Sequence, residues 1–229
     1  MKEQKNKILL IYGPQGSGNH LFSKIFALHD DVCGWKELLD DSKEENYFIP
    51  HYKQPNIDYW KNVDDINIDI MNGKKYAVLN ASVPLWNREL MVPPFNRMFR
   101  KLQELNIEVQ PVVIGRDKTI LTHQQTRLRG GPTWGVMTQV IRRLEITPFY
   151  VSLELLYLYR RNYIRDIGKW LQFPVADTDP RIDEILKEDS NQKYIVPAAN
   201  PFVDKLQKTQ GYHIQELGME PFFHTNLKK

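Results

Sequence analysis

The sequence has little cysteine, little net charge and no long apolar run. Its single cysteine, Cys33, cannot form a disulfide within the chain, which is typical of a reducing compartment. No apolar run approaches the about 20 residues that a membrane-spanning helix needs. The polar start, Met1–Lys7, lacks the small-residue cleavage site of a signal peptide. We therefore expect a soluble, cytoplasmic protein without a membrane partner.

The charge balance also argues against nucleic acid as a partner. The chain carries 31 Lys and Arg against 28 Asp and Glu, a net charge of +3, so no broad basic surface is expected. One local exception is the stretch 116–129, where Arg116, Lys118, Arg127 and Arg129 offer either a cationic surface for a small anion or an ordinary solvated helix face. The histidines show no metal-ligand spacing, so no metal site is predicted.

The order of apolar segments predicts an α/β fold. The run at residues 7–12, KILLIY, is typical of a strand that is covered on both faces of a parallel sheet, and a helical spacing of apolar residues follows a glycine-rich turn. Residues 40–72, rich in Asp, Asn and Lys, predict mostly loop with short helical pieces. The sequence thus predicts one domain over residues 1–229, a three-layer α/β domain of P-loop type with a central, mostly parallel sheet flanked by helices. Its further strands are expected at 76–80, 109–115 and 148–153, and its helices at 19–28, 94–105, 118–129, 135–144, 155–171 and 181–187.

The turn between the first strand and the first helix carries the clearest functional signal. Its sequence is Gly13-Pro14-Gln15-Gly16-Ser17-Gly18. Glycines at this point allow backbone N–H groups to converge on an anion, and the helix dipole adds positive potential there. The triphosphate-binding loop G-x-x-x-x-G-K-[ST] would need lysine and a hydroxyl where this chain has Asn19 and His20. A phosphate site without nucleoside-triphosphate chemistry is therefore predicted, with a purely structural tight turn as the alternative.

The chain has six short segments, at residues 11–21, 28–32, 36–37, 112–117, 150–156 and 169–174, that follow one another in a characteristic order. Together they resemble segments of sulfotransferases that use 3′-phosphoadenosine 5′-phosphosulfate (PAPS), in particular the carbohydrate and heparan type. Residues 11–21, IYGPQGSGNHL, are similar to the 5′-phosphosulfate loop, which often reads G-P-x-K-[ST]-G-T-T. Residues 28–32, LHDDV, are similar to L-H-P-D-V, and Lys36-Glu37 resembles the family's K-E pair. Residues 112–117, VVIGRD, resemble the start of the 3′-phosphate motif, and 150–156 with 169–174 resemble the family's C-terminal strand and helix.

The resemblance implies PAPS as co-substrate and a hydroxyl or amine acceptor, either a small molecule or a carbohydrate. By the same resemblance, Arg116 is the residue for the 3′-phosphate, with a salt bridge to Asp117 or Glu154 as its structural alternative. The chain departs from the family at Gly16, where the loop lysine belongs, and at Gln124, where the 3′-phosphate motif places a serine. The expected nucleotide-binding residues are Pro14, Gln15, Gly16, Ser17, Gly18, Asn19, His20, Arg116 and Gln124.

The resemblance also implies the catalytic residues. Glu37 of the K-E pair is the first choice for the base that takes the acceptor proton, and a surface glutamate is the alternative. Lys36 would supply positive charge that Gly16 does not, unless it is an ordinary solvated lysine. His20, at the start of the first helix, is a hydrogen-bond donor or an alternative base.

Three functions remain open on the sequence alone. The first is a PAPS-dependent sulfotransferase, which the order of the similar segments favours. The second is a nucleotide or small-molecule kinase, which the missing loop lysine disfavours. The third is a nucleotide-binding protein of the same fold without catalysis.

Overall fold

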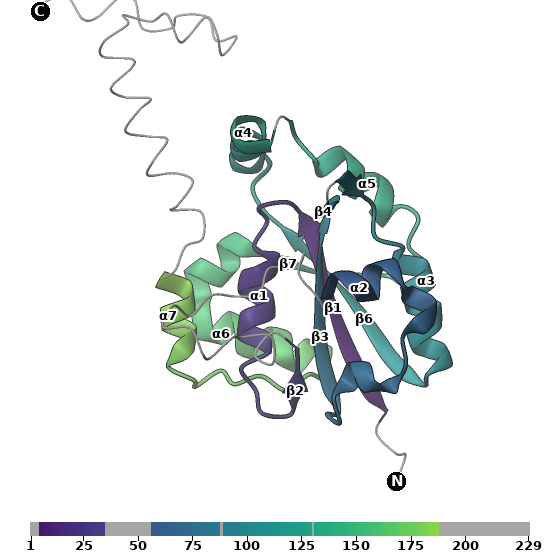
Figure 1. The fold of residues 1–229 in the computed structure, drawn as a ribbon. Coiled ribbons are helices and arrows are strands. Elements are labelled where there is room, and N and C mark those ends of the chain that lie inside the picture. Colours follow the sequence, from purple (N-terminus) through teal and green to yellow (C-terminus); the bar gives the residue numbers. More distant parts are fainter. Residues whose placement is uncertain (1–4, 35–55, 88, 130, 188–229) are drawn as a thin grey trace, which may run out of the picture. The chain divides into compact units, whose positions relative to one another are not determined.

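A five-stranded parallel sheet forms the centre of the molecule. The computed structural model describes residues 5–34, 56–87, 89–129 and 131–187 (Figure 1). All neighbouring strands in the sheet pair in parallel, with the order β2-β3-β1-β6-β7. The strands are β1 (Asn6–Pro14), β2 (Val32–Cys33), β3 (Tyr76–Val83), β6 (Ile107–Gly115) and β7 (Phe149–Ser152).

The position of β1 in the middle of the sheet explains why its sequence is apolar from Ile8 to Tyr12. Ile8, Leu10 and Tyr12 enter one hydrophobic cluster, whereas Leu9 and Ile11 enter the other, and all five side chains are fully buried. A strand between two helical layers has no polar face, so the alternating pattern of a half-exposed strand is absent. The predicted first strand is confirmed.

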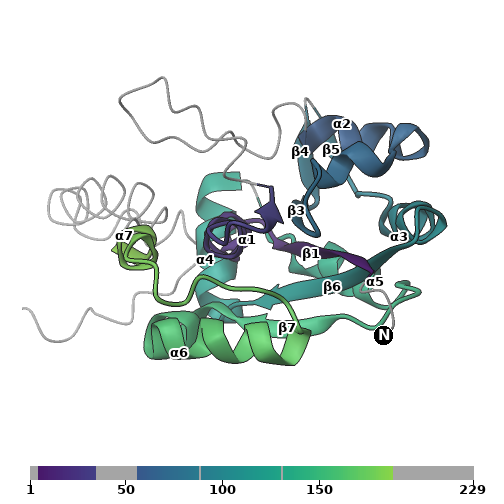
Figure 2. The same ribbon diagram turned by 90° about the horizontal axis from the view of Figure 1, so that it is seen from below.

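Helices cover both faces of the sheet. The cluster of Leu9 and Ile11 packs against α1 (Asn19–Phe26), α6 (Leu153–Leu171) and α7 (Arg181–Lys187). The opposite cluster packs against α2 (Asn56–Lys61), α3 (Phe95–Glu104) and α5 (Trp134–Ile141), with the short 3₁₀ helices η2 (Val63–Asp65) and η3 (Ile68–Met71). Figure 2 shows α6 and α7 on one side of the sheet and α2 and α3 on the other. The predicted three-layer α/β fold is confirmed.

Several elements differ in detail from the predictions. The two-residue strand β2 and the antiparallel hairpin of β4 (Leu85–Asn87) and β5 (Glu89–Met91) were not predicted. The proline in the third predicted strand is accommodated because β7 begins to pair only at Val112, so Pro111 precedes the stretch in which β6 has neighbours on both sides. The predicted helix at 118–129 is α4 (Lys118–Arg129).

Three further observations concern the extent of the compact unit, membrane-spanning helices and the cysteine. Residues up to Lys187 belong to one compact unit, and the single domain over 1–229 stays a prediction because 188–229 lie outside the described residues. Within the described ranges, no helix combines the length and the apolar character that crossing a membrane requires. Cys33 is buried in the core.

Candidate anion-binding site

The glycine-rich turn connects the buried strand β1 to helix α1 at the carboxyl edge of the sheet. The Ser17 N–H donates to the Pro14 carbonyl over 3.1 Å, which closes a tight turn. Gly16 and Gly18 have φ angles of 87° and 100°, in the left-handed region that favours glycine. A Cβ on Gly18 would also lie 2.9 Å from Leu153 Cδ1. The local geometry therefore requires the glycines that the sequence supplies.

The first turn of α1 opens toward this edge. The first hydrogen bond of the helix runs from the Phe22 N–H to the Gly18 carbonyl over 3.1 Å. The N–H groups of Asn19, His20 and Leu21 precede that bond and point out of the helix end, where the helix dipole is positive. Together with the turn, they form a set of donors suited to a phosphate. His20 is half-buried in the first turn of α1.

The predicted binding residues separate into a buried and an accessible group. Pro14, Gln15, Ser17 and Asn19 are buried. The Asn19 side chain donates to the Gly13 carbonyl at 3.2 Å, to the Ala81 carbonyl at 3.1 Å and to the Ser82 hydroxyl at 3.4 Å. Its Oδ1 accepts from the Ser17 hydroxyl at 3.0 Å. Asn19, which stands where a triphosphate loop has lysine, thus anchors the turn to β3.

Arg116 and Gln124 belong to the accessible group and lie against the turn. Arg116 follows β6, the strand next to β1, and Gln124 projects from α4. Arg116 Nη1 donates to the Gly16 carbonyl at 2.6 Å and to Gln124 Oε1 at 2.7 Å. Gln124 Oε1 is also the atom nearest to a Cβ on Gly16, at 3.1 Å. The fold therefore brings together three residues that the sequence placed in one site, although they are far apart in the chain.

Glu154 adds a negative charge near Arg116. Its carboxylate accepts hydrogen bonds of 2.8 Å from the Asp117 N–H and from the Ser152 hydroxyl. Partial burial raises the pKa of Glu154, but these hydrogen bonds and the charge of Arg116 outweigh burial and lower it overall. Asp117 accepts from the Ile120 N–H at 2.9 Å and so caps α4. Glu154 and Asp117 therefore shape the start of α4 beside the arginine.

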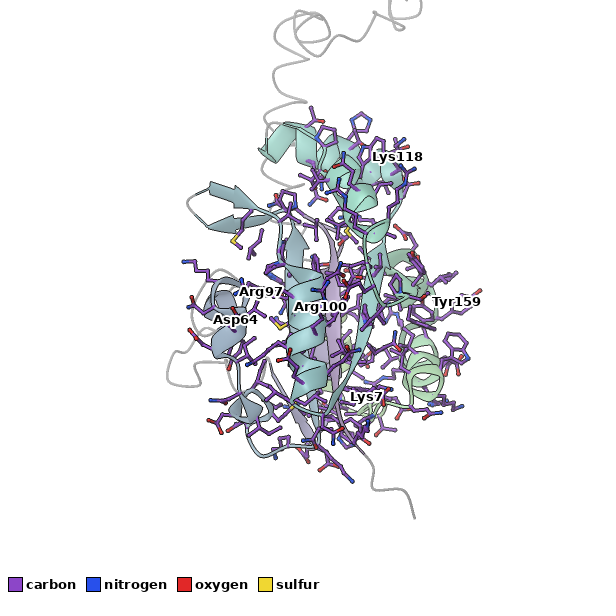
Figure 3. The ribbon with its side chains drawn as sticks, turned by 90° about the vertical axis from the view of Figure 1, so that its right-hand side faces the viewer. Lys7, Asp64, Arg97, Arg100, Lys118 and Tyr159 are labelled. Carbon is purple, nitrogen blue, oxygen red and sulfur yellow. The ribbon has the colours of Figure 1, made fainter. Side chains whose placement is uncertain are left out.

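The other cations of the stretch 116–129 have separate surroundings. The Lys118 ammonium lies 4.1 Å from the centre of the Trp134 ring, a cation–π contact that joins α4 to α5. Figure 3 labels Lys118. The side chains of Arg127 and Arg129 lie outside the described residues. Arg116 is thus the cation that the structure places beside the turn within the part of this stretch that it describes.

One contact of the turn has no counterpart in the sequence predictions. The Gln125 side chain is 1% exposed and donates to the Gln15 carbonyl at 2.5 Å. Its other bonds are to Thr133, just before α5. Gln125 follows another glutamine and stands between the polar residues His123 and Thr126, so the sequence gives no signal of its burial and only the tertiary structure reveals it.

The remaining predictions concern the K-E pair and metal binding. Glu37 and Lys36 lie in 35–55, outside the described residues. Across 5–34, 56–87, 89–129 and 131–187, no three His, Cys, Asp or Glu side chains are close enough to hold a metal ion.

Comparisons with known proteins give one structural neighbour to report. No protein-family model matches the chain, and no curated protein sequence matches it significantly. Among solved structures, the chain is similar to mouse sulfotransferase SULT7A1 complexed with PAP, at a TM-score of 0.39 and 11% sequence identity. The matched region covers 80% of this chain and 64% of the mouse chain.

Proposed function

We propose that this chain binds PAPS and transfers its sulfuryl group to a hydroxyl or amine acceptor. The observation that carries the proposal is the contact of Arg116 with the Gly16 carbonyl, because it sets a guanidinium beside a turn rich in N–H donors. A nucleotide with phosphates at both the 5′ and 3′ positions needs two such anion sites close together. The N–H groups of the turn and of α1 would hold the 5′-phosphate, and Arg116 with Gln124 would hold the 3′-phosphate.

The proposed chemistry relies on alignment and on electrostatic stabilisation. In sulfuryl transfer the acceptor oxygen or nitrogen attacks sulfur, the bond from sulfur to the bridging phosphate oxygen breaks, and the leaving bisphosphate gains negative charge. Preorganised N–H donors at the turn would stabilise that charge. Glu37 is the proposed base, His20 the alternative base, and Lys36 the proposed additional positive charge. The acceptor would be a small molecule or a carbohydrate, and we propose a cytoplasmic location.

A second candidate function is nucleotide binding without transfer. It is favoured by a specific observation. Gly16 occupies the position of the sulfotransferases' loop lysine, and the Asn19 side chain donates its hydrogen bonds to Ala81 and Ser82 of β3. A kinase receives no such support, since Asn19 and His20 replace the lysine and the magnesium-binding hydroxyl of the triphosphate loop.

A thermal-shift screen followed by a transfer assay tests the proposal. PAPS and adenosine 3′,5′-bisphosphate should each raise the unfolding temperature more than ATP or GTP. Binding to the folded state alone adds about 2.7 kcal/mol when the ligand is at a hundred times its Kd. Transfer of labelled sulfate from PAPS to a panel of hydroxyl and amine acceptors then separates an enzyme from a binding protein. A larger shift with ATP, or no shift with either PAPS or adenosine 3′,5′-bisphosphate, would reject the sulfotransferase proposal.

A further inference from the structure

Gln125 is a buried amide whose two ends are both engaged. Its Oε1 accepts from the Thr133 N–H at 2.6 Å, and its Nε2 donates to the Thr133 hydroxyl at 2.9 Å and to the Gln15 carbonyl at 2.5 Å. The Thr133 N–H can only donate, so it fixes which end of the amide is oxygen. The nitrogen must then face Gln15. The contact with the turn is therefore a directed hydrogen bond rather than a packing contact.

The Gln15 carbonyl is the central carbonyl of a β-turn. The turn runs from Pro14 to Ser17 and is closed by the 3.1 Å bond between them. With Gly16 in third position at φ 87°, the turn is of type II. A flip of the peptide between Gln15 and Gly16 would convert it to type I, and glycine allows either form because it has no Cβ.

The flip matters because a trans peptide holds its C=O and N–H on opposite sides. Reversing the Gln15 carbonyl would therefore also reverse the Gly16 N–H, which is one of the donors proposed for the 5′-phosphate. The hydrogen bond from Gln125 exists only in the observed orientation. Arg116 holds the next carbonyl, that of Gly16, so side chains from residues 116–125 engage two successive carbonyls of the turn.

We propose that Gln125 is a positioning residue that holds the Gln15–Gly16 peptide in its type II orientation and thereby fixes the direction of the Gly16 N–H. The inference rests on the proposed nucleotide site for its functional consequence. It assigns the anion affinity of the turn in part to a residue that does not touch the nucleotide. Its link to Thr133 also ties the turn to the start of α5.

Two variants separate this role from general stability. Gln125→Met keeps the length and volume of the side chain but cannot donate to the Gln15 carbonyl. Gln125→Glu keeps an acceptor for the Thr133 N–H and regains a donor only when its carboxyl is protonated, at a pKa that burial raises. Met137→Ala is the matched control, since Met137 is a buried core residue of α5, the helix that Thr133 precedes.

The experiment first measures the NMR signal of the Gly16 amide in the protein without nucleotide, and then the affinity for the nucleotide. In protein labelled with ¹⁵N-glycine, the Gly16 amide signal should shift or split in Gln125→Met and stay in place in Met137→Ala. In Gln125→Glu the signal should return to its wild-type position as the pH falls through the pKa of the introduced carboxyl. Calorimetry should show adenosine 3′,5′-bisphosphate binding roughly five- to tenfold more weakly to Gln125→Met, the loss expected for one neutral hydrogen bond.

An unchanged Gly16 signal in Gln125→Met would overturn the assignment. If Gln125→Met does not fold, the pH response of Gln125→Glu decides the question, and a signal independent of protonation would equally overturn it. Because the Gly16 signal is read without nucleotide, failure of the wild-type protein to bind the bisphosphate rejects the proposed function separately. A tenfold loss of affinity in Met137→Ala as well would reject the positioning role, because stability alone would then explain the effect.

Discussion

Replacing Arg116 with alanine tests whether this side chain binds the 3′-phosphate. The structure gives the arginine two tasks, because Nη1 already supports the Gly16 carbonyl and Gln124 in the protein without nucleotide. Loss of that support loosens the turn and should weaken every nucleotide that uses it. Loss of the contact with the 3′-phosphate should weaken only nucleotides that carry one.

The magnitude follows from these two contributions. A hydrogen bond to a charged group is worth about 1.5 to 3 kcal/mol, which corresponds to roughly ten- to a hundredfold in affinity. Arg116→Ala should therefore weaken adenosine 3′,5′-bisphosphate by at least that factor more than it weakens adenosine 5′-phosphate. Arg116→Lys is the matched control: it keeps the charge but loses the planar fork, so it should retain part of the preference.

Isothermal titration with both nucleotides at one ionic strength gives the required comparison. Salt must be fixed because exposed charge contacts weaken as it rises. An equal loss for the two nucleotides would assign Arg116 to the support of the turn alone. The proposed contact of Arg116 with a 3′-phosphate, on which the PAPS proposal depends, would then be rejected.

Three further substitutions test the site and the core. Gly18→Val should abolish nucleotide binding, because Gly18 has a φ of 100° and lies in the turn; Gly73→Val, at a φ of 68° with open space around it, is the control for backbone strain, and equal calorimetric losses would refute the site. Tyr12→Phe should raise the free energy of unfolding in urea by about 1 kcal/mol, because the buried hydroxyl has no hydrogen-bond partner among the described residues; a loss of stability would show that the hydroxyl is satisfied. Glu37→Gln should lower sulfate transfer roughly a hundredfold with PAPS binding retained, and a larger loss in His20→Asn would move the base to His20.

The sheet could be predicted from the sequence because its central strands are covered on both faces. Residues 8–12 form an unbroken apolar run, and the structure buries Ile8–Tyr12 completely. The hairpin of β4 and β5 could not be predicted, since three-residue strands carry no readable alternation. The start of α6 at Leu153 was placed two residues late because its cap, Ser152, also ends a strand.

The candidate site was predictable only where spacing along the chain carried the information. Arg116 and Gln124 were named from a motif, and the fold places both against Gly16. Asn19 was predicted as a ligand-binding residue from its position in the turn, but the inward direction of its side chain depends on the carbonyl of Ala81, on another strand. Gln125 had no signal at all, because its burial depends on Gln15 and Thr133, which the sequence gives no reason to place together.

The distribution of polar side chains around the turn bears on the chemistry that it can support. The buried members, Gln15, Ser17 and Asn19, bond to the protein itself: Gln15 Nε2 donates to the Pro84 carbonyl at 2.9 Å, and Ser17 bonds to Asn19. These bonds hold the backbone of the turn in one shape before any ligand arrives. Binding then rests on fixed N–H groups, which stabilise an anion without the entropy cost of ordering a long side chain. A lysine at position 16 would add a full charge at the leaving oxygen, and glycine does not. Under the proposed function, such a preorganised turn would support nucleotide binding more than rapid transfer. The rate of sulfate transfer, rather than affinity for the nucleotide, is therefore the measurement that distinguishes the two proposed functions.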